Sequence, residues 1–285
     1  RIDYQATDGD GDTENGQIHI NVDDDTPVIR DIDDHIYFNE DDLLASRGEG
    51  ESQGNDENAP REALSVSRDI RGDVNWGADG FGRVTSIDLD GEDLIVMPET
   101  AGDDSVTVYF DETGAVTLVE ADAAVTLLVN ENGDYTVTLN DNLLIEGAGQ
   151  NVFRLLDGGI QINAADSDGD EVDGGVLLKI DVRDDVPTAS HDHADHVRLD
   201  DDAQSGGNPG GIGDADPDLV NVTGTLAHSY GADGAGSTLL LDSHQEDGFV
   251  YSLNDDSTIL TISQDGIDVL KVTLGDTTSG DYTVE

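Results

Sequence analysis

An internal repeat constrains this chain more than any other feature of its sequence. Four short segments occur twice, and their order is the same in both copies. Ordered recurrence of this kind indicates successive copies of one folding unit. The four pairs are TDGDGD (7–12) with ADSDGD (165–170), INVDDDTP (20–27) with IDVRDDVP (180–187), GADG (77–80) with GADG (231–234), and GDYTV (133–137) with GDYTV (280–284).

The repeat divides the chain into three parts, with joints at Pro27 and Pro187. Residues 28–187 are expected to form one complete β-sandwich repeat. Residues 1–27 match the end of such a unit, so we expect them to be the C-terminal part of a preceding repeat. Residues 188–285 match its beginning and are expected to be a following repeat, truncated before its closing hairpin. A proline has no amide donor and can end a strand, which suits a joint.

The apolar residues predict an all-β fold. They alternate with polar residues in short runs rich in Val, Ile, Thr and Leu, and Asn-Gly and Asp-Gly turn signals separate the runs. No segment has a sustained helical period. Dense short strands with one apolar face are typical of a β-sandwich. Clear examples are SVTVYF (105–110), AVTLLV (124–129), DYTVTL (134–139) and VLLKIDV (176–182).

The charge of the chain is extreme, with 65 acidic and 12 basic residues and a formal net charge of −53. Such a surface repels nucleic acid and anionic membranes, and it attracts hard cations that prefer oxygen ligands. Low aromatic content and high charge also fit a disordered chain. The alternating apolar runs favour a folded chain wherever calcium is plentiful.

The sequence contains no cysteine, which excludes disulfides and thiolate metal sites. We find no apolar run near the length of a membrane span and no signal peptide. The chain begins and stops within its repeat pattern, so we expect it to be part of a longer protein.

Two D-x-D-x-D turns are candidate calcium sites. Alternate carboxylates in a tight turn can converge on one cation, and glycine permits the turn. Both copies lack the glycine and glutamate that an EF-hand places at positions six and twelve, so neither is an EF-hand. The alternative is a solvated Asp/Gly hairpin turn, and the second copy favours calcium. The residues are Asp8, Asp10, Asp12, Asp166, Asp168 and Asp170.

A second group of acids flanks the two prolines. Two like charges that lie about 4 Å apart repel each other by about 1 kcal/mol even in bulk water. A divalent cation between them turns this repulsion into attraction. We therefore predict calcium between consecutive domains, ligated from both sides of each proline. The alternative is an extended, self-repelling linker. The residues are Asp23, Asp24, Asp25, Asp31, Asp33, Asp34, Asp181, Asp184, Asp185, Asp192 and Asp195.

A third acidic group has two interpretations, a metal site or an exposed acidic turn, and the sequence does not decide between them. It comprises Glu40, Asp41 and Asp42 with their counterparts 200–202. Glycine- and acid-rich segments follow in both copies, at 46–60 and 203–216, and are predicted to be loops.

Other motifs carry little weight. His191, His193 and His196 have zinc-like spacing, but only His196 has a counterpart in the other copy. The Arg71-Gly72-Asp73 tripeptide, which cell-surface integrins recognise, is better explained by a turn glycine. No catalytic motif is present, and paired carboxylates are uninformative in so acidic a chain. We therefore expect no enzyme.

The succession GDYTVTL, ADSDGD and IDVRDDVP resembles the closing part of the long repeats in type I-secreted RTX adhesins of Gram-negative bacteria. The acidic NEDDLL after IYF resembles the start of the next repeat. The resemblance covers most of the chain, and its motifs are specific only in combination. It implies tandem immunoglobulin-like β-sandwich domains, stiffened by Ca²⁺, that extend an adhesin from the cell surface, with a C-terminal secretion signal outside this segment.

From these observations we expect a non-catalytic, calcium-binding extender region, secreted to the cell surface and involved in adhesion and biofilm formation. Its expected partners are neighbouring repeats, with no nucleic acid and no membrane insertion, and we expect a monomer. The alternative is that one domain is itself a module that binds a glycan or a peptide through the loops 46–60 and 203–216.

Overall fold

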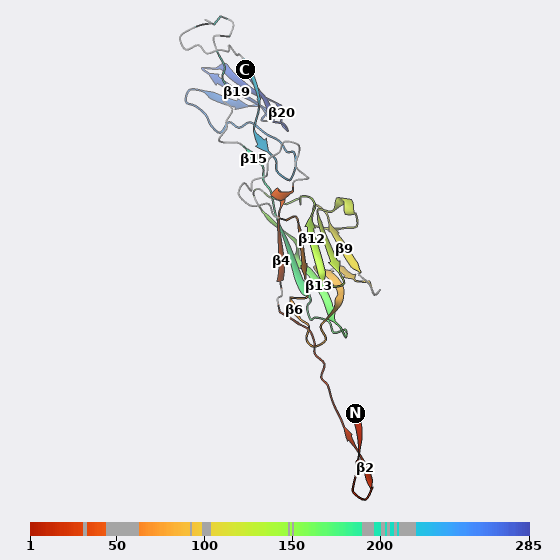
Figure 1. Cartoon of the computed structure of the whole chain (residues 1–285). Helices are drawn as coiled ribbons and strands as arrows, with labels where there is room; N and C mark the ends of the chain where they lie inside the picture. The colour runs from red at the N-terminus through yellow and green to blue at the C-terminus, as the bar shows by residue number, and fades with distance from the viewer. Residues whose placement is uncertain are drawn as a thin grey trace.

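Strands make up nearly all the regular structure of the protein, as the computed structural model in Figure 1 shows. The prediction of an all-β fold is therefore confirmed. Only two short 3₁₀ turns interrupt the strands among the described residues, at Glu40–Asp42 and Glu120–Asp122. The structure describes residues 1–30, 33–43, 63–91, 93–98, 104–147, 149, 151–189, 197–200, 203, 206–207, 210 and 221–285.

The central part of the chain forms two five-stranded sheets. One has the order β10-β9-β11-β12-β5 and the other the order β4-β14-β13-β7-β8. The strands of the first sheet are β5 (Ser65–Asp69), β9 (Ser105–Phe110), β10 (Val116–Thr117), β11 (Val125–Asn130) and β12 (Asp134–Leu139). Those of the second are β4 (Asp33–Asn39), β7 (Phe81–Leu89), β8 (Asp93–Val96), β13 (Val152–Asp166) and β14 (Val176–Arg183).

The two sheets share one apolar core because their strands alternate as the sequence predicts. In β11 and β12 every second residue is buried, which puts Leu127 and Val137 inside and their neighbours at the surface. Phe38 of β4 and Ile160 of β13 bring the second sheet into the same core. Strands β4 and β14 run parallel, and the other described pairs of these two sheets are antiparallel.

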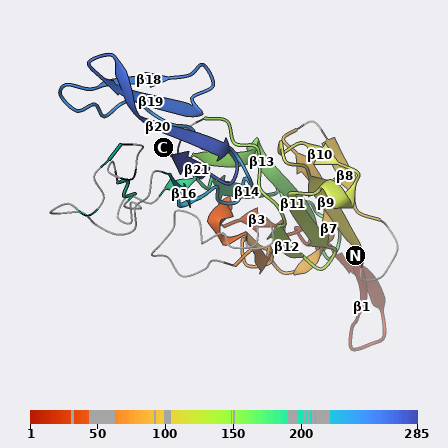
Figure 2. The same cartoon turned by 90° about the horizontal axis from the view of Figure 1, so that it is seen from above.

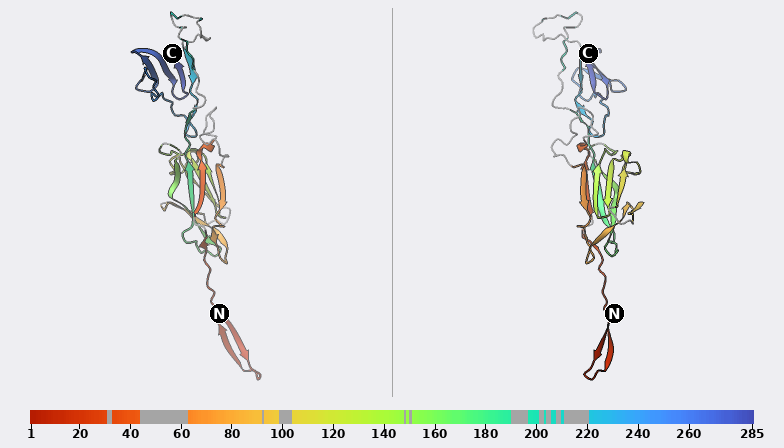
Figure 3. Two further views of the ribbon diagram at one scale, coloured as in Figure 1. Left: turned by 90° about the vertical axis from the view of Figure 1, so that its left-hand side faces the viewer. Right: turned by 45° about the vertical axis from the view of Figure 1, so that its right-hand side comes forward.

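The N-terminal part is a hairpin of two strands, β1 (Ile2–Thr7) and β2 (Thr13–Ile18). No further strand pairs with it in the described part of the chain. Residues 19–27 continue as extended chain to the central unit, and Figure 3 shows the hairpin at the far end of that segment. Its side chains are therefore exposed on both faces, including Ile2, Tyr4 and Ile18.

The C-terminal part contains one five-stranded sheet, in the order β16-β21-β20-β19-β18. Its small core is formed by Leu274, Tyr282 and Val284, with partly buried neighbours. No second sheet faces it in the part of the chain that the structure describes. The strands are β16 (Val222–Thr225), β18 (Val250–Leu253), β19 (Ile259–Gln264), β20 (Ile267–Asp276) and β21 (Asp281–Val284).

Two small strand pairs show that the repeat is structural as well as sequential. After Pro27, β3 (Val28–Ile29) pairs with β6 (Val74–Asn75). After Pro187, β15 (Thr188–Ala189) pairs with β17 (His228–Ser229). Figure 2, which looks along the molecule, shows the central unit between its neighbours. Each joint is thus followed by the same two-stranded element.

Most of the glycine- and acid-rich segments 46–60 and 203–216 lies outside the described residues. No helix in the described ranges is long and apolar enough to cross a membrane.

Candidate metal centres

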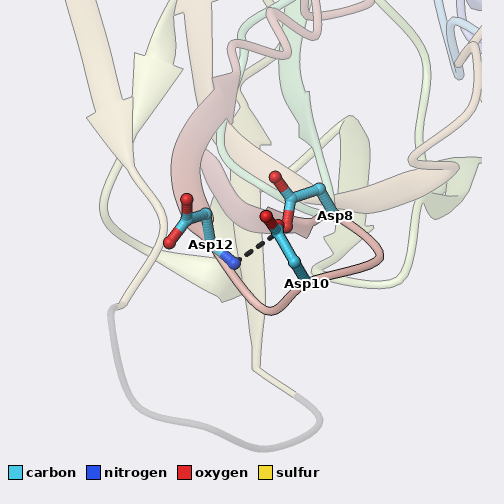
Figure 4. Close-up of side chains that lie close together, drawn as sticks. All are labelled: Asp8, Asp10 and Asp12. Carbon is cyan, nitrogen blue, oxygen red and sulfur yellow. Dashed lines mark hydrogen bonds between the residues drawn. The ribbon is translucent and has the colours of Figure 1, made fainter.

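The first D-x-D-x-D turn joins β1 to β2 and brings its three carboxylates together (Figure 4). The Asp8 carboxylate folds back over the turn and accepts hydrogen bonds from the backbone N–H of Gly11 at 3.0 Å and of Asp12 at 2.8 Å. A hydrogen bond from Asp10 and the bond from Asp12 lower the pKa of Asp8. Gly11 has φ +102°, which a residue with a side chain rarely adopts. All three aspartates are exposed.

The second turn, between β13 and β14, has the same geometry. Asp166 accepts from Gly169 N–H at 3.1 Å and from Asp170 N–H at 2.8 Å, and its own N–H reaches the Asp170 carbonyl at 3.0 Å. Here, however, Asp166 is buried, and its Oδ2 has no hydrogen-bond partner. A hydrogen bond with Asp166 and burial raise the pKa of Asp168 to about 6.

An aspartate before each proline fastens the joint to a glycine turn of the unit that follows. Asp25 accepts a hydrogen bond from Ala78 N–H at 3.0 Å, and Asp185 accepts the equivalent bond from Ala232 N–H at 2.7 Å. The carboxylate lies so close to the turn that a Cβ on Gly231 would be 2.2 Å from Asp185 Oδ2. The GADG motif therefore requires glycine here for space as well as for its positive φ.

The most enclosed candidate centre lies at the joint around Pro187. Its three carboxylates are Glu40 in the 3₁₀ turn directly after β4, Asp184 in the linker, and Asp233 in the GADG turn of the C-terminal unit. One oxygen from each lies within 4.8 Å of the others. Three segments that are distant in sequence thus meet at one point.

Glu40 is the best-placed ligand of this joint cluster. It is fully buried, and its Oε1 accepts a hydrogen bond from Leu143 N–H at 2.6 Å. Its Oε2 is buried without a hydrogen-bond partner. Burial, followed by the charges of Asp233 and Asp184, raises the pKa of Glu40 to about 8. Burial and the neighbouring aspartates likewise raise the pKa of Asp184 to about 6.

The joint around Pro27 carries an equivalent but exposed cluster of Asp24, Asp79 and Asp168. Asp24 corresponds to Asp184, and Asp79 corresponds to Asp233. Asp168 belongs to the D-x-D-x-D turn, which lies against the GADG turn because Ser167 N–H donates to the Gly80 carbonyl at 3.1 Å. The turn and the joint therefore form one acidic surface at this end of the central unit.

Both clusters offer only carboxylate oxygens within 4.8 Å of one another. Oxygen-only donor sets suit hard cations such as Ca²⁺, which accepts six to eight oxygens at about 2.3–2.6 Å. A buried anion without a partner costs free energy, and a cation beside Glu40 would remove that cost. The residues present therefore fit a calcium ion.

Two of the predicted ligands have structural partners instead. Asp34 is bound by Arg68 and by the hydroxyl group of Tyr135. Asp181 accepts two hydrogen bonds from Arg154, both at 2.8 Å, and one from His35 at 2.8 Å. The Asp181 contacts tie β14 to β13 and β4, and the Asp34 contacts tie β4 to β5 and β12 of the other sheet. Asp34 and Asp181 therefore do not belong to the candidate centres.

Among the predicted ligands not yet placed, only Asp23 has a described side chain, and it joins no cluster that the described residues form. Asp23 is exposed in the linker, and Asp33 is described only as part of the β4 backbone. Asp31, Asp192 and Asp195 lie outside the described residues, as do His191, His193 and His196.

Sequence reasoning left Glu40 open and missed Asp79 and Asp233. The signal for the two aspartates was present, because GADG recurs in both copies. The GADG motif by itself indicates a turn, because its two glycines are typical turn residues. The aspartate between them can be a ligand only if the turn lies beside other carboxylates, and the motif does not show that. Nothing in the sequence indicates that Glu40 is buried, because burial depends on how the 3₁₀ turn packs on the core.

The Arg71-Gly72-Asp73 tripeptide shows no separate role. The Arg71 side chain donates hydrogen bonds to Asp69 and to Asp134, and Asp73 N–H closes a turn onto the Ile70 carbonyl. These bonds explain the tripeptide as part of a strand connection.

Comparisons with protein-family models, with curated proteins and with solved structures found no match.

Proposed function

We propose that this chain is a calcium-stabilised, non-catalytic extender region of a secreted bacterial surface adhesin. Its units would be tandem immunoglobulin-like β-sandwiches of the kind found in RTX adhesins. The observation that carries the proposal is the joint cluster of Glu40, Asp184 and Asp233. A cation there would bind two successive units and their linker at once.

The charge of the chain supports a function that depends on calcium. At −53 the chain repels itself, and this repulsion is largest where the linker aspartates meet the turns of adjacent units. Calcium binding would replace repulsion with attraction, and binding free energy would become folding free energy. In the calcium-poor cytosol the chain would stay unfolded, as export by a type I system requires. Outside the cell it would fold.

The joint geometry supports a stiff rather than a hinged connection. Asp185 already fixes the GADG turn by a hydrogen bond, and Ala232 of that turn is buried against the core of the central unit. Calcium would add a second point of attachment on the other side of the linker. Two attachments restrict rotation about the joint more than one does.

Thermal unfolding of the whole chain in calcium and in a calcium chelator tests the proposal. We expect calcium to raise the Tm by several degrees, because each site would contribute about 2.7 kcal/mol when calcium is at a hundred times its Kd. Magnesium at the same concentration is the control, since it demands a smaller octahedral site. An unchanged Tm between calcium and chelator would contradict the proposal.

A second candidate is a ligand-binding module of the same class of adhesin. A cavity of about 740 Å³ beside the joint cluster favours it, with Leu144, Ile145 and Pro187 giving it an apolar wall. Apolar surface with a few polar groups can hold a glycan or a peptide. Glycan- and peptide-array screens in calcium test this candidate, and blank arrays would count against it.

A further inference from the structure

We propose that two cations bind side by side at the joint around Pro27 and share the carboxylate of Asp168. One ion would lie in the D-x-D-x-D turn of the central unit, and the other between the linker and the GADG turn. The inference rests on the proposed function, because it assumes that the chain binds calcium. It adds that two of the sites form one centre.

Asp168 belongs to both candidate clusters at this end of the central unit. Its carboxylate lies within 4.8 Å of oxygens of Asp166 and Asp170 in one cluster, and of Asp24 and Asp79 in the other. Among the described residues these five acids form two groups of three that meet at Asp168. Two oxygens bound to one calcium lie at most about 5 Å apart, twice the Ca–O distance. The arrangement therefore suits two ions rather than one.

Asp166 supplies the separate observation that points to a cation. It is only 3% exposed. Its Oδ1 accepts the backbone hydrogen bonds from Gly169 and Asp170, whereas its Oδ2 is buried without a hydrogen-bond partner. A buried carboxylate oxygen without a partner costs free energy, and a cation beside it removes that cost. The turn thus holds one ligand oxygen that is withdrawn from water and that no described group satisfies.

The three segments that supply the ligands are held together without a metal. Ser167 N–H donates to the Gly80 carbonyl at 3.1 Å, and the Ser167 hydroxyl donates to the Phe81 carbonyl at 3.2 Å. These bonds fix the D-x-D-x-D turn to the chain next to the GADG turn. On the linker side, Asp25 accepts the hydrogen bond from Ala78. The ligands are therefore already close before any ion binds, and little chain entropy remains to be lost.

The charges of the linker and of the turn oppose each other across the joint. Burial, followed by the charges of Asp24, Asp166 and Asp79, raises the pKa of Asp170. One divalent ion would lower the charge of the five carboxylates from −5 to −3, and a second would lower it to −1. Ions in two-metal sites lie about 3.5–4 Å apart and repel each other. The second ion would nevertheless still meet an excess of negative charge.

A shared ligand couples the central unit to its linker. The first ion would hold the turn that joins β13 to β14, and the second would hold the linker to that turn. Because both ions need Asp168, loss of this side chain should release both. Loss of Asp24 or of Asp170 should release only one ion each.

Counting the calcium bound by intact chains tests the shared ligand. Equilibrium dialysis is carried out at the calcium concentration that just saturates the wild type. Substitution by alanine removes both oxygens, whereas an asparagine amide oxygen could still bind calcium. We expect Asp168→Ala to bind two ions fewer than the wild type, and Asp24→Ala and Asp170→Ala one ion fewer each. Asp173→Ala, at an exposed position shortly after the turn, is the matched control and should bind as many ions as the wild type.

The same count separates this proposal from the one on which it rests. A wild-type chain that binds no calcium would reject both proposals. A wild type stabilised by calcium, together with an Asp168→Ala chain that loses one ion or none, would reject the shared centre alone. Asp168 is exposed, so we expect its replacement to leave the circular dichroism of the chain in calcium unchanged.

The single tryptophan of the chain gives a test that needs no variant. Trp76 lies three residues before Asp79 and directly follows β6, at the opposite end of the central unit from β15 (Figure 1). Terbium ions that replace calcium in this centre should emit when Trp76 is excited. Europium added at equal concentration should shorten the lifetime of that emission, because the neighbouring ion would lie only about 4 Å away. Absent emission, or a lifetime that europium leaves unchanged, would overturn the proposal.

Discussion

Glu40 is the residue on which the C-terminal joint depends. It is a fully buried carboxyl group that faces two aspartates, and only one of its oxygens has a hydrogen-bond partner. Without a cation, burial favours its protonated form. With a cation, the charged form becomes the stable one. The same side chain therefore opposes folding in one condition and supports it in the other.

Replacing Glu40→Gln should separate these two effects. The amide oxygen can still accept the hydrogen bond from Leu143, but the charge is gone. In chelator we expect the variant to be as stable as the wild type or more so. In calcium we expect it to lose about 2 kcal/mol or more of the stabilisation by the ion. Glu120→Gln, at an exposed site in the same unit, is the control and should respond to calcium as the wild type does. Thermal melts of the three proteins measure this.

The pH dependence of the calcium-free protein follows from the same residue. The folded state keeps the Glu40 proton up to a pKa of about 8, whereas the unfolded chain releases it near the ordinary value of 4.5. The folded state thus binds more protons between these limits, and stability should fall as the pH rises through them, by on the order of 3–5 kcal/mol. Urea midpoints in calcium-free buffer measure the fall. If Glu40→Gln does not flatten this profile, another group is responsible.

At the scale of the element, β14 shows that acids close together in sequence have different roles. Asp181 points to Arg154 on β13 and His35 on β4, so it joins three strands of one sheet. Asp184 follows the end of the same strand and faces Glu40. Arg154 lowers the pKa of Asp181, although burial alone would raise it. Burial and neighbouring acids raise that of Asp184.

Asp181→Asn and Asp184→Asn should therefore respond differently to calcium. The first removes an ion pair that water screens in part, because Arg154 is partly exposed. We therefore expect the free energy of unfolding to fall by about 1–3 kcal/mol, in calcium and in chelator alike. The second should lose stability only in calcium. Because the pKa of Asp181 is lowered, its contribution is present at neutral pH and disappears as the pH falls through the folded pKa. Chemical unfolding with and without calcium distinguishes the two residues.

At the scale of the whole molecule, the units are joined by short acidic linkers, and calcium should govern the joint at Pro187. Its cluster takes one carboxylate from each side of the linker and one from the linker itself. The hydrogen bond from Ala232 to Asp185 joins the two units without metal. Calcium would therefore narrow the range of angles between the units rather than create the contact between them.

Small-angle scattering of the intact chain should show this narrowing. We expect the longest interatomic distances in the pair-distance distribution to span a narrower range when calcium is added. Asp233→Asn should reduce the change, because it removes the ligand supplied by the C-terminal unit. Asp247→Asn, an exposed residue of that unit outside the cluster, is the control. A profile in Asp233→Asn that sharpens as fully as in the wild type would argue against a bridge at this joint.

The sequence by itself determined the strand class, the positions of the joints and the D-x-D-x-D turns. These are local properties, since alternation, turn residues and the order of repeated motifs act over a few residues. It also marked most of the acidic surface, because charge is additive and can be counted.

Only the tertiary structure decided which carboxylates meet. Asp34 and Asp181 belong to the acidic runs in sequence, yet Arg68 of the other sheet binds Asp34, and Arg154 of the adjacent strand binds Asp181. Glu40, Asp184 and Asp233 are far apart in sequence and close in space. The physical reason is that an ion pair or a cation site depends on distances between strands and units, and these distances are fixed by the packing of the two sheets and of the joint.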